Sequence, residues 1–85
     1  MEHRPQVDKL ADEMERRLAA HDEDRDRDGW LGEPLEYLHI RLRTEVAELV
    51  LAIANQEGSE SVWREAADVA NFAMMLADNY EVMYR

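Results

Sequence analysis

Apolar side chains recur at helical spacing in three segments of the 85-residue chain. The first segment runs from about Gln6 to Ala20. Its apolar positions, three and four residues apart, are Val7, Leu10, Met14 and Leu18. On its other side stand two acid-before-base pairs four residues apart, Asp12–Arg16 and Glu13–Arg17. This pattern predicts an ordinary amphipathic helix with a solvated charged face.

The second segment begins at Pro34, a residue that suits the first position of a helix. It continues to about Glu57, where Gly58 can end it. The apolar stripe that should face the core comprises Leu35, Leu38, Leu42, Val46, Leu49 and Ile53.

The third segment runs from about Glu60 to Tyr84, with Ser59 or Ser61 expected as the N-cap. Apolar residues lie on nearly every side of it, in a stripe and in an opposite set, Ala67, Ala70, Met74 and Ala77. Such a helix is buried on several faces, and a small three-helix chain cannot cover it alone. The sequence therefore predicts an all-α fold, in which a three-helix protomer completes a helical bundle by dimerisation.

Length and charge narrow the class of protein. We expect residues 1–85 to form a single domain. The formal net charge of −10 disfavours nucleic acid as a partner, and a phosphate ligand would need a cation as a bridge. Because neither a signal segment nor a membrane span is recognisable, we expect a cytoplasmic protein without a membrane partner.

Residues 21–33 form an acidic, glycine-containing loop before the second helix. Asp24, Asp26, Asp28 and Gly29 match the opening of an EF-hand calcium loop. The twelfth position, which should be a bidentate glutamate, is Leu35. We therefore expect a solvated acidic loop, with calcium binding as a weaker alternative.

Two pairs of carboxylates stand at the edge of the apolar stripes. Glu45 and Glu48 lie three residues apart on the second helix, and Glu65 and Asp68 lie three apart on the third. Like charges about 5.5 Å apart repel by about 3 kcal/mol at an effective dielectric near 20. The pairs are either solvated charge clusters or a site with compensating cations.

Two kinds of cation can compensate these acids. Arg41 and Arg64 each precede an acid by four residues, Glu45 and Asp68 respectively. Four carboxylates on facing helices also match the oxygen ligands that Mg²⁺ or Mn²⁺ prefers. The sequence therefore identifies a candidate metal site.

The motif Glu45-x-x-Glu48, followed after 16 residues by Glu65-x-x-Asp68, resembles the ExxE…ExxD signature of MazG-type all-helical pyrophosphohydrolases. The similarity extends over about Trp30 to Tyr80. It implies hydrolysis of a nucleoside triphosphate between the α and β phosphates, giving a monophosphate and pyrophosphate. It also implies Mg²⁺ bound by the four acids, and a homodimer or a tetramer of two dimers.

The resemblance suggests further roles. Glu45 or Glu48 is the candidate general base. Arg27 corresponds to a basic residue of similar proteins, and Gly29 and Trp30 correspond to their Gly-Trp. Arg27 would then face phosphate, and Trp30 would pack over a base or anchor the core. The remaining candidates for substrate binding are Asn71, Arg41 and Arg64, although Asn71 equally suits a helix–helix hydrogen bond. One departure is Thr44, where relatives often have another acid.

Two alternatives stay open. One is a related enzyme with another substrate, such as phosphoribosyl-ATP pyrophosphohydrolase or a deoxynucleotide-specific relative, because nothing in the sequence specifies the base. The other is a catalytically inactive helical adaptor that dimerises and binds a partner protein.

Overall fold

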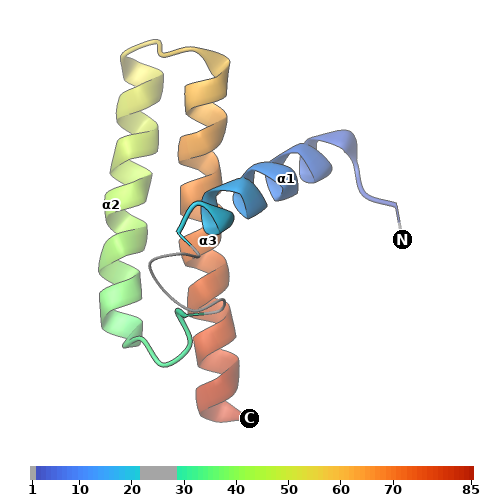
Figure 1. Ribbon diagram of the computed structural model, residues 1–85. Helices are drawn as coiled ribbons and strands as arrows, with labels where there is room; N and C mark the ends of the chain where they lie inside the picture. Colours follow the sequence, from blue (N-terminus) through green and yellow to red (C-terminus); the bar gives the residue numbers. More distant parts are fainter. Residues whose placement is uncertain (1, 22–28) are drawn as a thin grey trace.

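The computed structural model describes residues 2–21 and 29–85. These residues form three α-helices and no strand: α1 (Pro5–Ala19), α2 (Leu35–Ala54) and α3 (Ser59–Tyr84). The predicted all-α class is therefore confirmed for the described chain. Helices α2 and α3 run side by side in opposite directions as a hairpin, and α1 crosses α3 (Figure 1).

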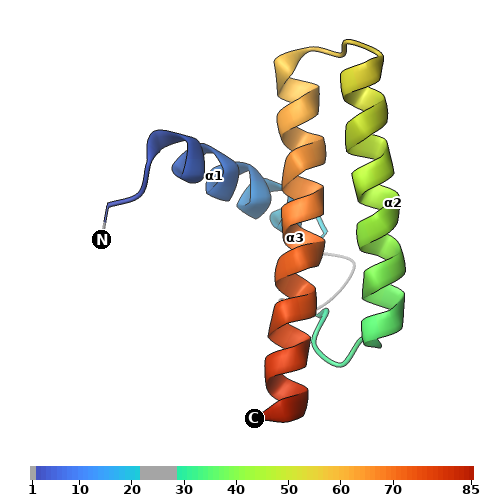
Figure 2. The same ribbon diagram turned by 180° about the vertical axis from the view of Figure 1, so that it is seen from behind.

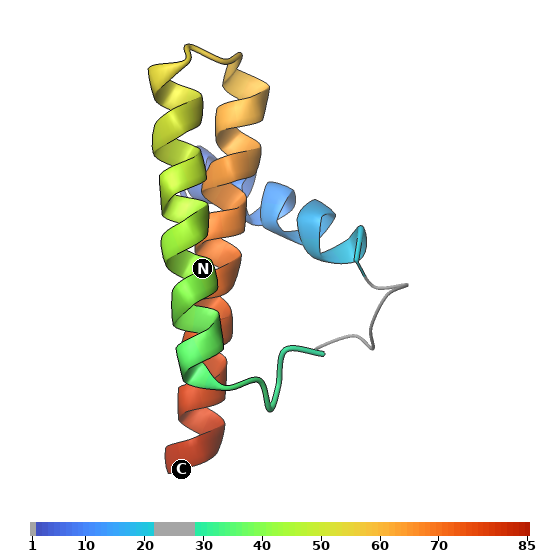
Figure 3. The ribbon, with the colours of Figure 1, turned by 90° about the vertical axis from the view of Figure 1, so that its left-hand side faces the viewer.

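Helix α3 is the centre of the arrangement, because it packs against both α1 and α2. Seen from behind, the N-terminal half of α1 extends away from the hairpin (Figure 2). A view from the side of α2 places α1 beyond α3 (Figure 3). Contacts with two helices of its own chain account for part of the apolar character of α3. Near its C-terminal end, large apolar side chains are still exposed, namely Tyr80, Val82, Met83 and Tyr84.

The helix ends differ from the predicted ones at the α2–α3 connection. Helix α2 ends at Ala54, before the predicted Glu57, because Gln56 has a positive φ of 55° that no α-helix accommodates. Gly58, and not a serine, is the N-cap of α3. The Ser61 hydroxyl instead donates a hydrogen bond to Glu57 Oε1 at 2.5 Å.

The loop before α2 is fastened to α3 through Trp30. Its indole Nε1 donates to Asp78 Oδ2 (3.0 Å), and its carbonyl oxygen accepts from Asn79 Nδ2 (2.9 Å). Asn79 Oδ1 accepts from the backbone N–H of Gly32 (2.8 Å), whose φ of +92° suits glycine. Trp30, Leu38 and Met75 form a buried core cluster, so the segment from Trp30 to Gly32 is held firmly against α3.

Much of the uncovered apolar surface belongs to α2. The sequence placed Val46 and Ile53 in the core-facing stripe, but their exposed fractions are 41% and 57%. Helix α3 covers only one side of α2, and α1 lies beyond α3. The other large apolar side chains exposed on α2 are Tyr37, Ile40, Val50 and Leu51. Among the described residues no helix is both long and apolar enough to cross a membrane.

Candidate metal centre and adjoining pocket

Three carboxylates converge between α2 and α3. Glu45 of α2 and Glu65 and Asp68 of α3 each offer one oxygen, and these oxygens lie within 4.8 Å of one another. Glu45 is only 5% exposed. Glu48, one turn further along α2, is exposed and is not one of the three, although its carboxyl group interacts with that of Glu45. The structure therefore brings together three of the four predicted ligands.

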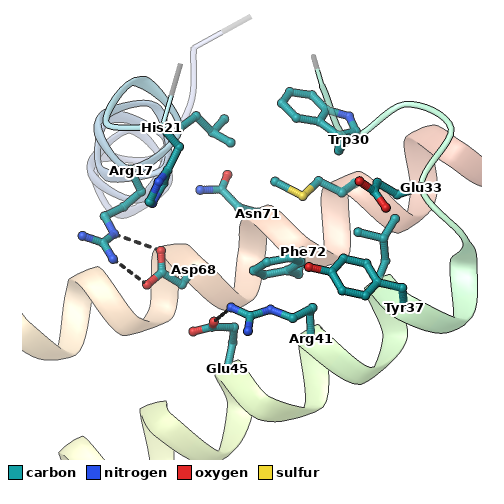
Figure 4. Close-up of a pocket in the computed structure, with 13 residues that line it drawn as sticks. Arg17, His21, Trp30, Glu33, Tyr37, Arg41, Glu45, Asp68, Asn71 and Phe72 are labelled. Atoms are coloured by element: carbon teal, nitrogen blue, oxygen red, sulfur yellow. Dashed lines mark hydrogen bonds and ion pairs between the residues drawn. The ribbon is translucent and has the colours of Figure 1, made fainter. Parts of the chain in front are cut away.

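Two arginines neutralise part of this charge. The Arg17 guanidinium of α1 donates to both oxygens of Asp68, at 2.9 and 3.1 Å. Arg41 of α2 donates to Glu45 Oε1 at 2.9 Å, as its spacing predicted. Figure 4 shows both contacts. The expectation that Arg64 compensates Asp68 is wrong, because Arg64 is exposed and Arg17 is the partner of Asp68.

Three buried side-chain oxygens of the described residues lack a hydrogen-bond partner. They are Glu45 Oε2, Glu65 Oε2 and Asn71 Oδ1. An unsatisfied buried polar group costs about 1–3 kcal/mol, and more when it is charged. All three belong to the carboxylate cluster or to the helical turn that follows Asp68. Such a concentration of unsatisfied acceptors needs an explanation, and a bound ion or ligand would supply one.

The environment also changes proton affinities in the cluster. Burial, interaction with the carboxyl group of Glu48 and the charge of Asp68 together raise the pKa of Glu45 to about 7, against the opposing effect of Arg41. Burial and the charges of Asp68 and Glu48 raise the pKa of Glu65. The cluster thus holds its negative charge poorly without a further cation.

A pocket of about 260 Å³ adjoins the cluster and is enclosed by the end of α1, the loop before α2, and the facing sides of α2 and α3 (Figure 4). Glu45 and Asp68 stand in its wall together with their arginine partners. The remainder of the wall is largely apolar and aromatic, and it includes Trp30, Leu38, Phe72 and Met75. Such a pocket suits a ligand with one charged end and one planar end.

The substrate-binding candidates are divided by the structure. Trp30, Arg41 and Asn71 line the pocket, whereas Arg64 does not. Trp30 belongs to the core and to the pocket wall at once. Asn71 Nδ2 donates to the Met14 carbonyl oxygen at 3.1 Å, so the predicted helix–helix hydrogen bond is present. Arg27 and the acidic run at 24–28 lie outside the described residues.

Arg17 is the site residue that the sequence analysis missed. The i, i+4 spacing pairs it with Glu13, but Glu13 accepts a hydrogen bond from Arg16 (2.6 Å), and Arg17 reaches across to α3. A signal was present. At about 100° per residue, Arg17 points about 20° beyond Leu10, at the border of the apolar stripe of α1. A cation in that position needs a buried or half-buried anion on the facing helix.

Comparison of the chain with protein-family models, with curated proteins and with solved structures gave no match.

Proposed function

We propose that this protein is a Mg²⁺-dependent nucleoside triphosphate pyrophosphohydrolase of the MazG type, which cleaves between the α and β phosphates. One observation supports this above all: a partly unsatisfied carboxylate cluster adjoins a pocket with a charged side and an aromatic side.

The donor set fits a hard divalent cation. Its atoms are all carboxylate oxygens, and Glu45 and Glu65 each have a buried oxygen without a hydrogen-bond partner. Mg²⁺ and Mn²⁺ both favour such ligands. In this proposal Glu45, Glu65 and Asp68 hold the ion, and the exposed Glu48 joins them. When bound, the ion supplies positive charge that neutralises phosphate oxygens.

The side chains of the protein would then share the remaining tasks. Arg17 and Arg41, which now hold Asp68 and Glu45, are within the pocket wall and can donate to phosphate oxygens instead. Glu45 or Glu48 accepts a proton from the attacking water. The rings of Trp30 and Phe72 provide apolar surface for the nucleoside and exclude water from it.

A second copy of the chain completes the protein in this proposal. Val46, Val50 and Ile53 are all exposed and lie within about 60° of one another on one side of α2. Exposed apolar patches of this kind usually mark interaction surfaces. Packing of α2 against its counterpart would bury Val46, Val50 and Ile53. The α2–α3 hairpins of the two copies would then form a four-helix bundle.

The test is pyrophosphate release from a panel of nucleoside triphosphates and phosphoribosyl-ATP, with and without Mg²⁺. We expect release only with Mg²⁺, and its loss in Glu65→Gln. The matched control is Glu60→Gln in the exposed first turn of α3, which should retain activity. Absence of pyrophosphate from every nucleotide, or equal activity in Glu65→Gln, would overturn the proposal and favour the adaptor alternative.

A further inference from the structure

We propose that Asn71 Oδ1 is a fixed hydrogen-bond acceptor for the nucleoside part of the ligand, namely a base N–H or a sugar hydroxyl. This inference rests on the proposed function, because it assumes that a nucleotide occupies the pocket beside the carboxylate cluster.

The hydrogen bond of Nδ2 fixes the orientation of the Asn71 amide. Nδ2 donates to the carbonyl oxygen of Met14, which can only accept. Rotation of the amide by half a turn would bring two oxygens together. Oδ1 is therefore held as an acceptor, and it has no partner among the described residues.

A second buried asparagine of α3 shows what a purely structural amide looks like here. Asn79, two turns further along, donates through Nδ2 to the Trp30 and Met75 carbonyl oxygens, and its Oδ1 accepts from Gly32 N–H. Both asparagines are nearly fully buried, at 3% and 4% exposed. Asn79 uses both ends of its amide within the protein, whereas Asn71 leaves its acceptor for something else.

The position of Asn71 selects the part of the ligand. It lines the pocket one helical turn after Asp68, and Figure 4 shows it between His21 and Trp30 in that view. A phosphate group presents acceptor oxygens, which an amide oxygen repels. A nucleoside has donors on the base edge and on the sugar, and its planar ring matches the adjacent Trp30 and Phe72.

The test uses calorimetric binding of nucleoside monophosphates in Mg²⁺, which needs no turnover. The four common monophosphates identify the tightest binder. Two derivatives of it are then compared: one whose base lacks the N–H donors, and one that lacks both sugar hydroxyls. We expect one of the two derivatives to bind about 10- to 100-fold more weakly than the parent. In Asn71→Ala this difference should largely vanish.

The two derivatives distinguish the base from the sugar as the donor. The inference is overturned if both derivatives bind like the parent, if Asn71→Ala keeps the full discrimination, or if no monophosphate binds. Pyrophosphate release without such discrimination would leave the proposed function standing and remove only the role of Asn71. Asn71→Ala also loses the hydrogen bond to the Met14 carbonyl oxygen. If this variant does not fold, the binding of the parent monophosphate and its two derivatives to the wild type decides whether the acceptor role stands.

Discussion

Arg17 and Asp68, 51 residues apart, form a bidentate ion pair that joins α1 to α3. The guanidinium meets both carboxylate oxygens in the bidentate geometry that makes such pairs strong. The Asp68 side chain is 17% exposed, and that of Arg17 is 37% exposed. The docking of α1 is thus coupled to the charge of the carboxylate cluster.

Removal of Arg17 tests this coupling. Arg17→Ala leaves Asp68 beside Glu45 and Glu65 without its cation, so we expect the metal-free protein to lose about 1–3 kcal/mol in free energy of unfolding. The matched control is Arg64→Ala, which removes an exposed arginine that does not pair with Asp68 and should change stability much less. Urea denaturation measures both. Equal effects of the two variants would show that the pair does not fasten α1.

Neutralisation of Glu45 should have opposite effects with and without metal. Glu45→Gln removes a buried charge that repels Asp68. The free energy of unfolding of the metal-free protein should therefore rise by about 1–2 kcal/mol. Mg²⁺ should stabilise the wild type but not this variant, because the variant lacks one ligand. Thermal unfolding with and without Mg²⁺ measures both effects. Glu36→Gln, in the exposed first turn of α2, is the control and should respond to Mg²⁺ like the wild type.

The raised pKa of Glu45 also predicts a pH dependence. Between pH 4.5 and about 7 the folded protein keeps a proton on Glu45 that the unfolded chain releases. The free energy of unfolding without metal should therefore fall as the pH rises through this window, by at most about 3 kcal/mol. Denaturation of the wild type and of Glu45→Gln at each pH isolates this contribution. Parallel pH curves for the two proteins would contradict the assignment.

The exposed face of α2 predicts the oligomeric state. Val50 is 59% exposed, so Val50→Glu should leave the protomer folded but place a charge in the proposed dimer interface. Light scattering should give the mass of a dimer or tetramer for the wild type and a reduced mass for the variant. Val7→Glu, at a residue 49% exposed on α1, should keep the wild-type mass. A monomeric wild type would remove the dimer from the proposal.

Local periodicity was sufficient to predict the three helices and the meeting of Glu45 with Glu65 and Asp68. Each of those acids borders a stripe of apolar residues, and stripes pack together. The same rule misplaced Val46 and Ile53, because α2 is apolar on two sides and the sequence does not say which side α3 covers. It also missed Gln56 as the residue that ends α2, since a left-handed glutamine has no local signal.

The crosswise placement of α1 lay beyond sequence reasoning for a different reason. The periodicity of a helix gives the direction of each side chain around the helix axis. It does not give the angle at which that helix crosses another. Only that angle brings Arg17 to Asp68 and the Met14 carbonyl to Asn71. The pocket exists because of this crossing, so the place of Arg17 in its wall could be identified from the structure alone.

The proposed function requires that Glu45, Glu65 and Asp68 share one divalent cation. Its most direct test is a titration with Mn²⁺, followed by electron paramagnetic resonance of the free ion, on the wild type and on Glu65→Gln. We predict one saturable site per protomer in the wild type and its loss in the variant, with Glu60→Gln unchanged. Weak, unsaturable uptake that is the same in all three proteins would contradict the claim.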